Sequence, residues 1–198
     1  EKEVFKREEC EFGYRDSIFK NKLKGKYFIS AVTLKLSKAE KKNINYILLQ
    51  EYLEENKVEI KNSKDISDAV ASIRKSKLPD PVLICNAGSF FKNVFVTKGK
   101  MENFLLTYPD MPYFKEPADA SAVSGREENI KIPAGWLIEK CGWKGKRIGN
   151  VGVHERQALV LVNYGGATGE EVKNLSEQII ASVFSKFGLT LEKEVNLI

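Results

Sequence analysis

Residues 158–198 decide the fold, and they read ALVLVNYGGATGEEVKNLSEQIIASVFSKFGLTLEKEVNLI. Residues 158–163 form a short apolar run, which predicts a strand. Thr168 and Glu171, three residues apart, form a capping box. Apolar residues then recur every three or four positions up to Gly188, which predicts an amphipathic helix with a glycine stop. Residues 189–198 predict a closing strand, so this stretch indicates helices packed on a sheet.

Helical and strand patterns also cover the rest of the chain. Apolar residues on one helical face predict helices at 44–56, 66–77, 100–108 and 134–141. Asp65 is the predicted N-cap of the second helix. Runs of β-forming residues predict strands at 27–36, 89–97 and, more weakly, 4–10, and the prolines of residues 109–131 predict an exposed loop. We therefore expect an α+β protein with a mixed sheet and packed helices.

The composition is that of a globular protein. Of 198 residues, 42% are hydrophobic and 30% charged, which excludes disordered, collagenous and disulfide-scaffold classes. No apolar run approaches the roughly 18 residues of a membrane span, and no leader opens the chain. The net charge of +5 falls within residues 1–42, which hold 12 Lys and Arg against 7 Asp and Glu. Because the chain opens on Glu1, we expect a removed initiator or a start inside a longer protein.

Neither a metal site nor a common nucleotide motif is predicted. The three cysteines, Cys10, Cys85 and Cys141, are far apart and form no CxxC, and His154 is the single histidine. We expect free thiols in a reducing compartment. The sequence has no GxGxxG after a strand, no phosphate-binding GxxxxGK and no GxSxG nucleophile motif.

Three segments could carry chemistry, and each has a plainer interpretation. Residues 74–93 combine cations with the small residues NAGS, which fits phosphate binding or simply a solvated turn before a strand. Residues 12–17, FGYRDS, could stack on a ring and hold an anion, or form a surface turn. Glu194 could act as a general acid if it were buried, because burial raises the pKa of a carboxyl group, or it could lie on an exposed strand face.

Three ordered strings then carry a resemblance to a known family. They are FGYRDSIFK at 12–20, KLPDP with NAGSFFKN at 77–81 and 86–93, and AGWLIEKCGWKGKRIG with the segments that follow it at 134–196. They closely resemble the C-terminal part of the UDP-N-acetylenolpyruvoylglucosamine reductases, the MurB flavoenzymes also called UDP-N-acetylmuramate dehydrogenases. The FGYRDS loop is typical of the type I subgroup.

The resemblance implies an oxidoreductase of peptidoglycan precursor synthesis. Such enzymes use NADPH and FAD to reduce the enolpyruvyl ether of UDP-N-acetylglucosamine enolpyruvate to a lactyl ether, giving UDP-N-acetylmuramate. The carbanion or enol that forms must be protonated, so the site needs a proton donor and a stabilising group. The resemblance assigns the proton donor to Ser89 and the acidic group to Glu194.

The resemblance also assigns binding roles. Lys77 matches a diphosphate contact, which suits a flexible cation. Asn93 matches a further substrate contact, and Tyr14 matches a tyrosine that closes over the substrate. Lys140 stands where the family can have a glutamine that contacts substrate, so this contact becomes ionic. Arg74 is assigned to cofactor binding, and no residue is assigned to a metal.

The same resemblance implies two parts and a compartment. Residues 1–36 resemble the last strands of a FAD-binding domain with its tyrosine loop, and residues 37–198 resemble the UDP-sugar domain. We expect the missing FAD-binding region to be the partner, so that this chain alone holds no FAD firmly and is inactive. A cytoplasmic location without membrane or nucleic-acid partners is expected. The alternative is a non-catalytic UDP-sugar or nucleic-acid binding module, the latter suggested by the pI of about 8.9.

Overall fold

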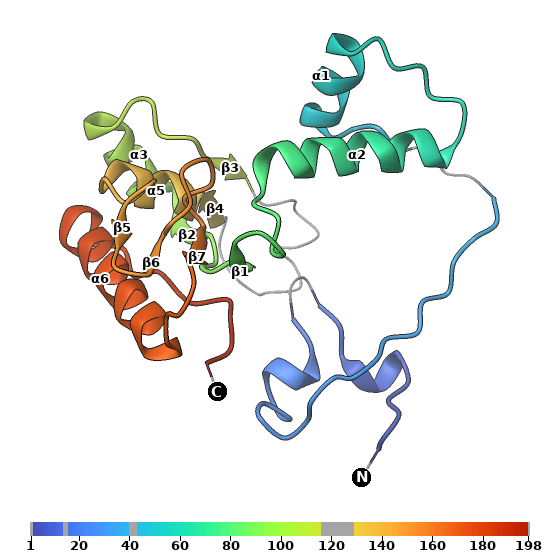
Figure 1. Ribbon diagram of the computed structural model, residues 1–198, viewed down its shortest axis with the longest axis horizontal. Coiled ribbons are helices and arrows are strands. Elements are labelled where there is room, and N and C mark those ends of the chain that lie inside the picture. Colours follow the sequence, from blue (N-terminus) through green and yellow to red (C-terminus); the bar gives the residue numbers. More distant parts are fainter. Residues whose placement is uncertain (1, 14–15, 40–42, 116–128, 198) are drawn as a thin grey trace.

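The computed structural model describes residues 2–13, 16–39, 43–115 and 129–197, and within them the chain has five α-helices and two β-sheets (Figure 1). The predicted α+β class is confirmed. The prediction of a mixed sheet is wrong, because every strand pair in these residues is antiparallel. Strands β5, β6 and β7 follow one another through short connections, and short connections join antiparallel neighbours.

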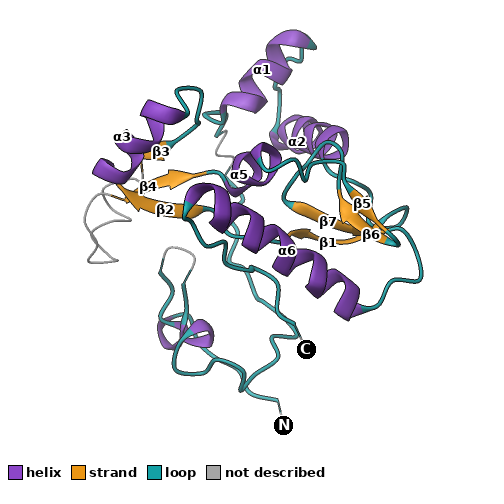
Figure 2. Ribbon diagram, turned by 90° about the vertical axis from the view of Figure 1, so that its left-hand side faces the viewer, coloured by secondary structure: helices purple, strands orange, loops and turns teal. Residues whose placement is uncertain are grey.

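The larger sheet has four strands in the order β1-β7-β6-β5. Their bounds are Cys85–Ser89 for β1, Arg147–Ile148 for β5, Val151–Val153 for β6 and Val160–Asn163 for β7. Strands β6 and β7 are almost wholly buried, and the long helix α6 (Gly169–Phe187) packs against β6 (Figure 2). The predicted strand at 158–163 is confirmed, whereas β5 and β6 are too short to show a periodic pattern.

The smaller sheet has three strands in the order β2-β4-β3. Strand β2 is Val94–Thr97, β3 is Phe114–Lys115 and β4 is Asn129–Ile132, and helices α3 (Lys98–Thr107) and α5 (Ala134–Lys140) follow β2 and β4. The single strand predicted at 89–97 is wrong, because the chain leaves one sheet after Ser89 and enters the other at Val94. The predicted loop at 109–131 contains β3 and most of β4, and its residues 116–128 lie outside the described residues.

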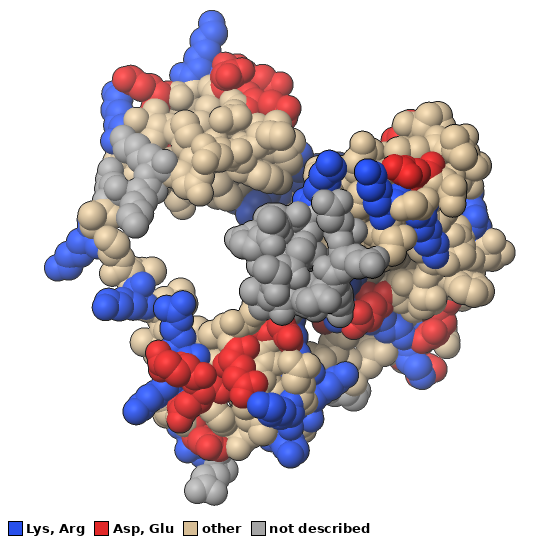
Figure 3. Space-filling model, turned by 180° about the vertical axis from the view of Figure 1, so that it is seen from behind, with Lys and Arg blue, Asp and Glu red and all other residues tan. Residues whose placement is uncertain are grey.

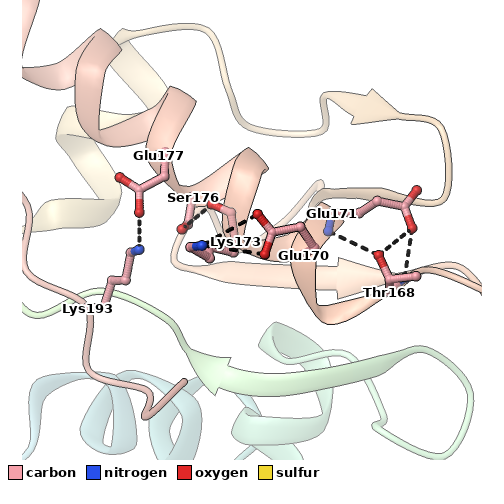
Figure 4. Close-up of polar contacts among 7 residues, drawn as sticks. All are labelled: Thr168, Glu170, Glu171, Lys173, Ser176, Glu177 and Lys193. Atoms are coloured by element: carbon pink, nitrogen blue, oxygen red, sulfur yellow. Dashed lines mark hydrogen bonds and ion pairs between the residues drawn. The ribbon is translucent and has the colours of Figure 1, made fainter. Parts of the chain in front are cut away.

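Helix α6 has the limits that its sequence predicts. The Thr168 hydroxyl accepts the Glu171 N–H at 3.2 Å, and the Glu171 carboxylate accepts the Thr168 N–H at 2.7 Å (Figure 4). Gly188 ends the helix in the left-handed conformation, with φ of 61°. Its apolar face joins the main core through Leu175, Ile179, Val183 and Phe187. Burying each such side chain contributes about 1.5–3 kcal/mol, so this face anchors the helix.

Helices α1 (Ile47–Glu55) and α2 (Ser63–Lys77) form a hairpin with a separate small core. That core consists of Leu49, Leu53 and Ala69. The predicted N-cap of α2 is wrong by three residues: Asn62 is the cap, and Asp65 accepts the Asn62 N–H at 3.0 Å as its capping-box partner. Asp65 was a plausible cap from sequence because both members of a capping box are polar residues that favour a helix start.

The described part of the chain before α1 contains two short 3-10 helices, Glu8–Cys10 and Ile18–Lys20. Phe5 contacts Phe19 and Tyr27 edge-to-face, with ring centroids 5.0 and 5.1 Å apart. The strands predicted at 4–10 and 27–36 are absent from the described residues, and the chain from Phe28 to Ala39 runs extended and exposed (Figure 1). A strand needs a partner for its backbone, and no described residue pairs with this segment in a sheet.

The C-terminal segment is also less regular than its sequence predicts. In place of a strand over 189–198, the described part has one isolated antiparallel bridge, between Phe91 and Lys193. Leu189 and Leu191 are nonetheless buried in the main core. No helix in the described ranges is long and apolar enough to cross a membrane.

Candidate functional site

Ser89 ends strand β1 directly after a β-bulge. Between Asn86 and Ser89 the register of β1 against β7 slips. Gly88 absorbs the extra residue with φ of 73°, a left-handed conformation that glycine adopts without the clash of a side chain. The Asn86 side chain accepts the Gly88 N–H at 3.0 Å and donates to the Ile84 carbonyl at 2.8 Å. The NAGS sequence therefore builds the bulge that leaves Ser89 exposed at the strand end.

Glu194 lies on the C-terminal segment, which pairs with the chain just after Ser89. The Glu194 N–H donates to the Phe90 carbonyl at 2.8 Å, and the Phe90 N–H donates to the Leu159 carbonyl at 2.8 Å. Phe90 is thus held between β7 on one side and the C-terminal segment on the other. The backbone of Glu194 thus lies opposite Phe90, one residue after Ser89, and the side chains of Ser89 and Glu194 are both exposed.

Side chains alternate along the C-terminal segment as the sequence predicts. Glu192 and Glu194 are exposed, while Lys193 and Val195 between them are half-buried. The Lys92 N–H donates to the Glu192 carbonyl at 2.8 Å, and the side chains of these two residues form an ion pair. Glu194 therefore has the exposed face of the prediction, and not the buried environment that would favour a general acid.

Asn93 lies between the two sheets, one residue before β2. Its Oδ1 accepts the N–H of Ala134, the first residue of α5, at 3.1 Å. This contact caps a helix end that would otherwise leave a backbone donor without a partner. Because the carbonyl oxygen of Asn93 has this structural role, a contact with substrate falls to the Nδ2 group.

Lys77 and Arg74 lie together on the last turns of α2. They line an open groove of about 330 Å³, whose other walls are Tyr46, Leu48, Val70, Ile73, Leu78 and Gln157. Among the described residues that line it, none is Ser89, Asn93 or Glu194. Of the site residues predicted from sequence, the structure therefore brings Arg74 and Lys77 together at the groove. The chain around Ser89 pairs with the chain around Glu194 in a different part of the fold.

Arg156 connects this groove to the larger sheet. Its Nη1 donates to the carbonyl of Ser76 at 3.0 Å, one residue before Lys77. A cation at the C-terminal end of a helix is favoured by the helix dipole. No local sequence pattern indicates this contact, because its partners lie 80 residues apart.

Lys140 ends α5 and contacts groups of its own chain. Its ammonium pairs with Asp110 at 2.7 Å and lies 5.3 Å from the centre of the Trp136 ring. The hydrogen bond from Lys140 lowers the pKa of Asp110. A substrate contact at Lys140 would therefore compete with this ion pair.

Tyr14 lies outside the described residues, together with Arg15. The residues on either side are described, and they pair with each other: Gly13 N–H donates to the Asp16 carbonyl at 3.0 Å, and Asp16 N–H donates back at 3.3 Å. The Asp16 carboxylate also accepts the Ser17 N–H at 2.8 Å. The loop that carries Tyr14 thus starts and ends at one backbone pair.

His154 and the cysteines take structural positions in the described residues. The His154 Nδ1 accepts the Arg156 N–H at 3.3 Å, and burial, followed by the nearby Arg156 charge, lowers the pKa of this imidazole. The three thiols are free, and burial raises the pKa of Cys141. No group of three or more His, Cys, Asp and Glu side chains that could hold a metal ion occurs in the described part of the chain.

Charge does not form a broad basic surface on the face shown in Figure 3. Acidic and basic side chains are interspersed there over the bulkier parts of the molecule, whereas the extended stretch at the left of the view shows basic side chains alone. Several cations are also engaged within the chain: Lys146 lies 4.2 Å from the Trp143 ring centre, and Arg147 lies 4.1 Å from that of Tyr164. Nucleic-acid binding, which needs cations presented together, is not favoured.

The groove beside Arg74 is small for a dinucleotide cofactor. Its volume is at the low end of those that hold a single drug-sized ligand, and a flavin dinucleotide is larger than such a ligand. This groove alone therefore does not hold FAD.

The chain is similar to one family of known proteins. Residues 80–198 match the family model for the C-terminal domain of UDP-N-acetylenolpyruvoylglucosamine reductase. This match includes Ser89, Asn93, Lys140 and Glu194, and it starts after Lys77.

Relatives that carry the same name match the whole chain. The UDP-N-acetylenolpyruvoylglucosamine reductase of Flavobacterium johnsoniae is 46% identical over 100% of this chain and 56% of its own length. Those of Amoebophilus asiaticus and Pseudomonas aeruginosa are 48% and 44% identical, each over 98% of this chain and 55% and 54% of their lengths. The chain thus spans about half the length of these relatives.

Proposed function

The chain belongs to the UDP-N-acetylenolpyruvoylglucosamine reductase family through its C-terminal domain, and from this premise we propose that it forms the substrate side of such a reductase. The reaction proposed for the whole protein reduces UDP-N-acetylglucosamine enolpyruvate to UDP-N-acetylmuramate in peptidoglycan precursor synthesis. The observation that supports the proposal is the backbone pairing of Glu194 with Phe90, the residue that follows Ser89, because it brings these two stretches of chain side by side.

The chemistry that we propose for this chain is protonation. Reduction of the enolpyruvyl double bond adds a hydride to one carbon and a proton to the other. The hydride belongs to FAD and NADPH, which the family resemblance implies for the whole reductase. Ser89 is the proposed proton donor, and since an alcohol is a weak acid, it needs a charged or hydrogen-bonded neighbour. Glu194 is the proposed neighbour.

Substrate binding is proposed for four residues. Lys77, on the groove of α2, is proposed to contact the diphosphate, because a lysine is a compact cation on a flexible stem. Asn93 is proposed to contact the substrate through Nδ2. Lys140 is proposed to leave its ion pair with Asp110 and contact the substrate instead. Tyr14 is proposed to close over the bound substrate. Arg74, beside Lys77, is proposed for the cofactor.

We further propose that residues 1–36 belong with a FAD-binding domain and residues 37–198 form the UDP-sugar domain. The extended, exposed chain from Phe28 to Ala39, which follows the N-terminal aromatic cluster, supports a boundary there. The reaction is proposed to take place in the cytoplasm, in keeping with three free thiols. We expect this chain alone neither to hold FAD nor to oxidise NADPH. A yellow preparation that oxidises NADPH would contradict that expectation.

The test of substrate binding is a titration of the 198-residue chain with UDP-N-acetylglucosamine, followed by the amide resonances in NMR spectra. We expect shifts at Lys77, Ser89 and Asn93 at millimolar ligand. Lys77→Met should weaken binding about tenfold, because it removes a charge-assisted contact with the diphosphate. Lys75→Met is the matched control: it removes the same charge from the same helix end, outside the groove.

Two results would oppose the proposal. Unchanged resonances at all three residues would overturn it. Equal weakening by Lys77→Met and Lys75→Met would show only general attraction of an anion to a basic helix end. A salt-dependent retention on RNA or DNA, with no response to the nucleotide sugar, would instead favour the binding-module alternative.

A further inference from the structure

Glu177 links the long helix α6 to the segment that carries Glu194. Its carboxylate forms an ion pair with the ammonium of Lys193, the residue just before Glu194 (Figure 4). The Lys193 side chain is only 20% exposed, and that of Glu177 is 54% exposed. The hydrogen bond from Lys193 lowers the pKa of Glu177, so the carboxylate stays charged at neutral pH.

The segment around Glu194 is attached by few backbone contacts. One isolated bridge joins Lys193 to Phe91, and two backbone hydrogen bonds flank it. The Lys92–Glu192 ion pair and Val195, which packs against the main core, also hold the segment, whereas Asn196 and Leu197 are exposed. Because one bridge near the end of a chain opens easily, the position of Glu194 also depends on what holds residue 193.

The Glu177–Lys193 ion pair attaches the C-terminal segment to a helix that is itself anchored in the core. Its residues Leu175, Ser176 and Ile179, on either side of Glu177 in sequence, are at most 1% exposed. Alternation along the C-terminal segment turns Lys193 to the face opposite those of Glu192 and Glu194. The ion pair therefore holds the segment from the face opposite Glu194 and does not involve the Glu194 carboxylate.

We propose that Glu177 is a positioning residue: by holding Lys193 against α6, it fixes the bridge to Phe91 and keeps Glu194 paired beside Ser89. The catalytic role of Glu194 rests on the proposed function. The positioning of residues 193 and 194 by the Glu177–Lys193 ion pair is a property of the folded chain and does not depend on that function.

The experiment is amide hydrogen exchange of the 198-residue chain at neutral pH, measured residue by residue by NMR. Glu177→Gln keeps the shape of the side chain and removes its charge. Exchange at the Glu194 amide should become about fivefold faster, the size expected when a partly exposed ion pair is lost. Glu170→Gln is the matched control, since Glu170 lies on the same helix and pairs with Lys173. It should leave exchange at Glu194 unchanged.

A double-mutant cycle separates positioning from a general effect on the helix. Lys193→Met should also speed exchange at Glu194, and adding Glu177→Gln should have no further effect, because the pair is already broken. Lys193→Arg should preserve slow exchange. Unchanged exchange in Glu177→Gln, or additive effects in the cycle, would overturn the proposal. Failure of the proposed function would look different: the nucleotide sugar would shift no resonance, while the exchange results would stand.

Discussion

His154 makes the stability of the molecule depend on pH. It is the only histidine, and burial and the Arg156 charge lower its pKa below the ordinary value of 6.5, against a smaller opposite effect of Glu155. Because the unfolded imidazole takes up a proton at higher pH than the folded one, its contribution to stability is complete above about pH 6.5 and declines as the pH falls below it.

His154→Asn should reduce this acid sensitivity. Asparagine offers an oxygen to the Arg156 N–H and does not titrate, so the free energy of unfolding should fall less between pH 7 and pH 5 than in the unaltered chain. Urea unfolding at both values measures the difference. Carboxyl groups whose pKa is lowered, such as Asp110, change charge below pH 5, so they do not affect the comparison between pH 7 and pH 5. Equal losses in both proteins would mean that His154 does not titrate differently on folding.

Gly88 is the residue on which the position of Ser89 depends. A side chain there meets no atom within 4 Å, so the cost of Gly88→Ala is the left-handed backbone alone, about 1–2 kcal/mol of stability. Gly99→Ala is the control of opposite sign. Gly99 also has open space and lies in α3, where alanine should stabilise by about 0.5–1 kcal/mol. Urea unfolding measures whether stability falls in Gly88→Ala and rises in Gly99→Ala. An unchanged free energy of unfolding in Gly88→Ala would show that the bulge relaxes to accommodate alanine.

At the scale of elements, helix α6 shows what a sequence determines locally. Its cap, its apolar face and its stop all lie within 21 residues, from Thr168 to Gly188, and each was predicted. Thr168→Ala should cost about 1 kcal/mol, because the Glu171 N–H loses its acceptor. Thermal or urea unfolding measures this cost. Thr190→Ala, an exposed threonine beyond the helix, should change stability by less than about 0.5 kcal/mol.

Strands and the candidate site depend on pairing between segments that are distant in sequence, and a local sequence pattern does not identify the paired segment. The alternation at 27–36 is real, but no described residue forms a ladder with it, so it is not a strand. The break after Ser89 follows from two consecutive buried phenylalanines, Phe90 and Phe91, which no single strand face accommodates. The residue types at Ser89 and Glu194 were visible in sequence. Their adjacency was not, because it arises from a pairing across about 100 residues.

The whole molecule is assembled from parts with separate apolar contacts. The main core, the α1–α2 core and the N-terminal aromatic cluster share no residue. Residues 28–39, which follow the aromatic cluster, form an extended chain, and Figure 1 shows them running free of the helices and sheets. This segment is one place where the molecule presents apolar surface to its surroundings.

That surface is a stripe of alternate side chains at residues 28, 32, 34 and 36. Phe28 is 92% exposed, and Val32 and Leu34 are each 72% exposed. An extended backbone with one apolar face favours association with another chain or binding of an apolar dye. Changing Phe28, Val32 and Leu34 together to serine should therefore lower anilinonaphthalene sulfonate fluorescence by about half or more, with stability changed by less than about 0.5 kcal/mol. Thr33→Ser with Lys35→Ser alters the other face and should leave the fluorescence as it was. Undiminished dye binding in the triple variant would mean that the exposed apolar surface lies elsewhere, whereas a large loss of stability would mean that the stripe packs against the rest of the molecule.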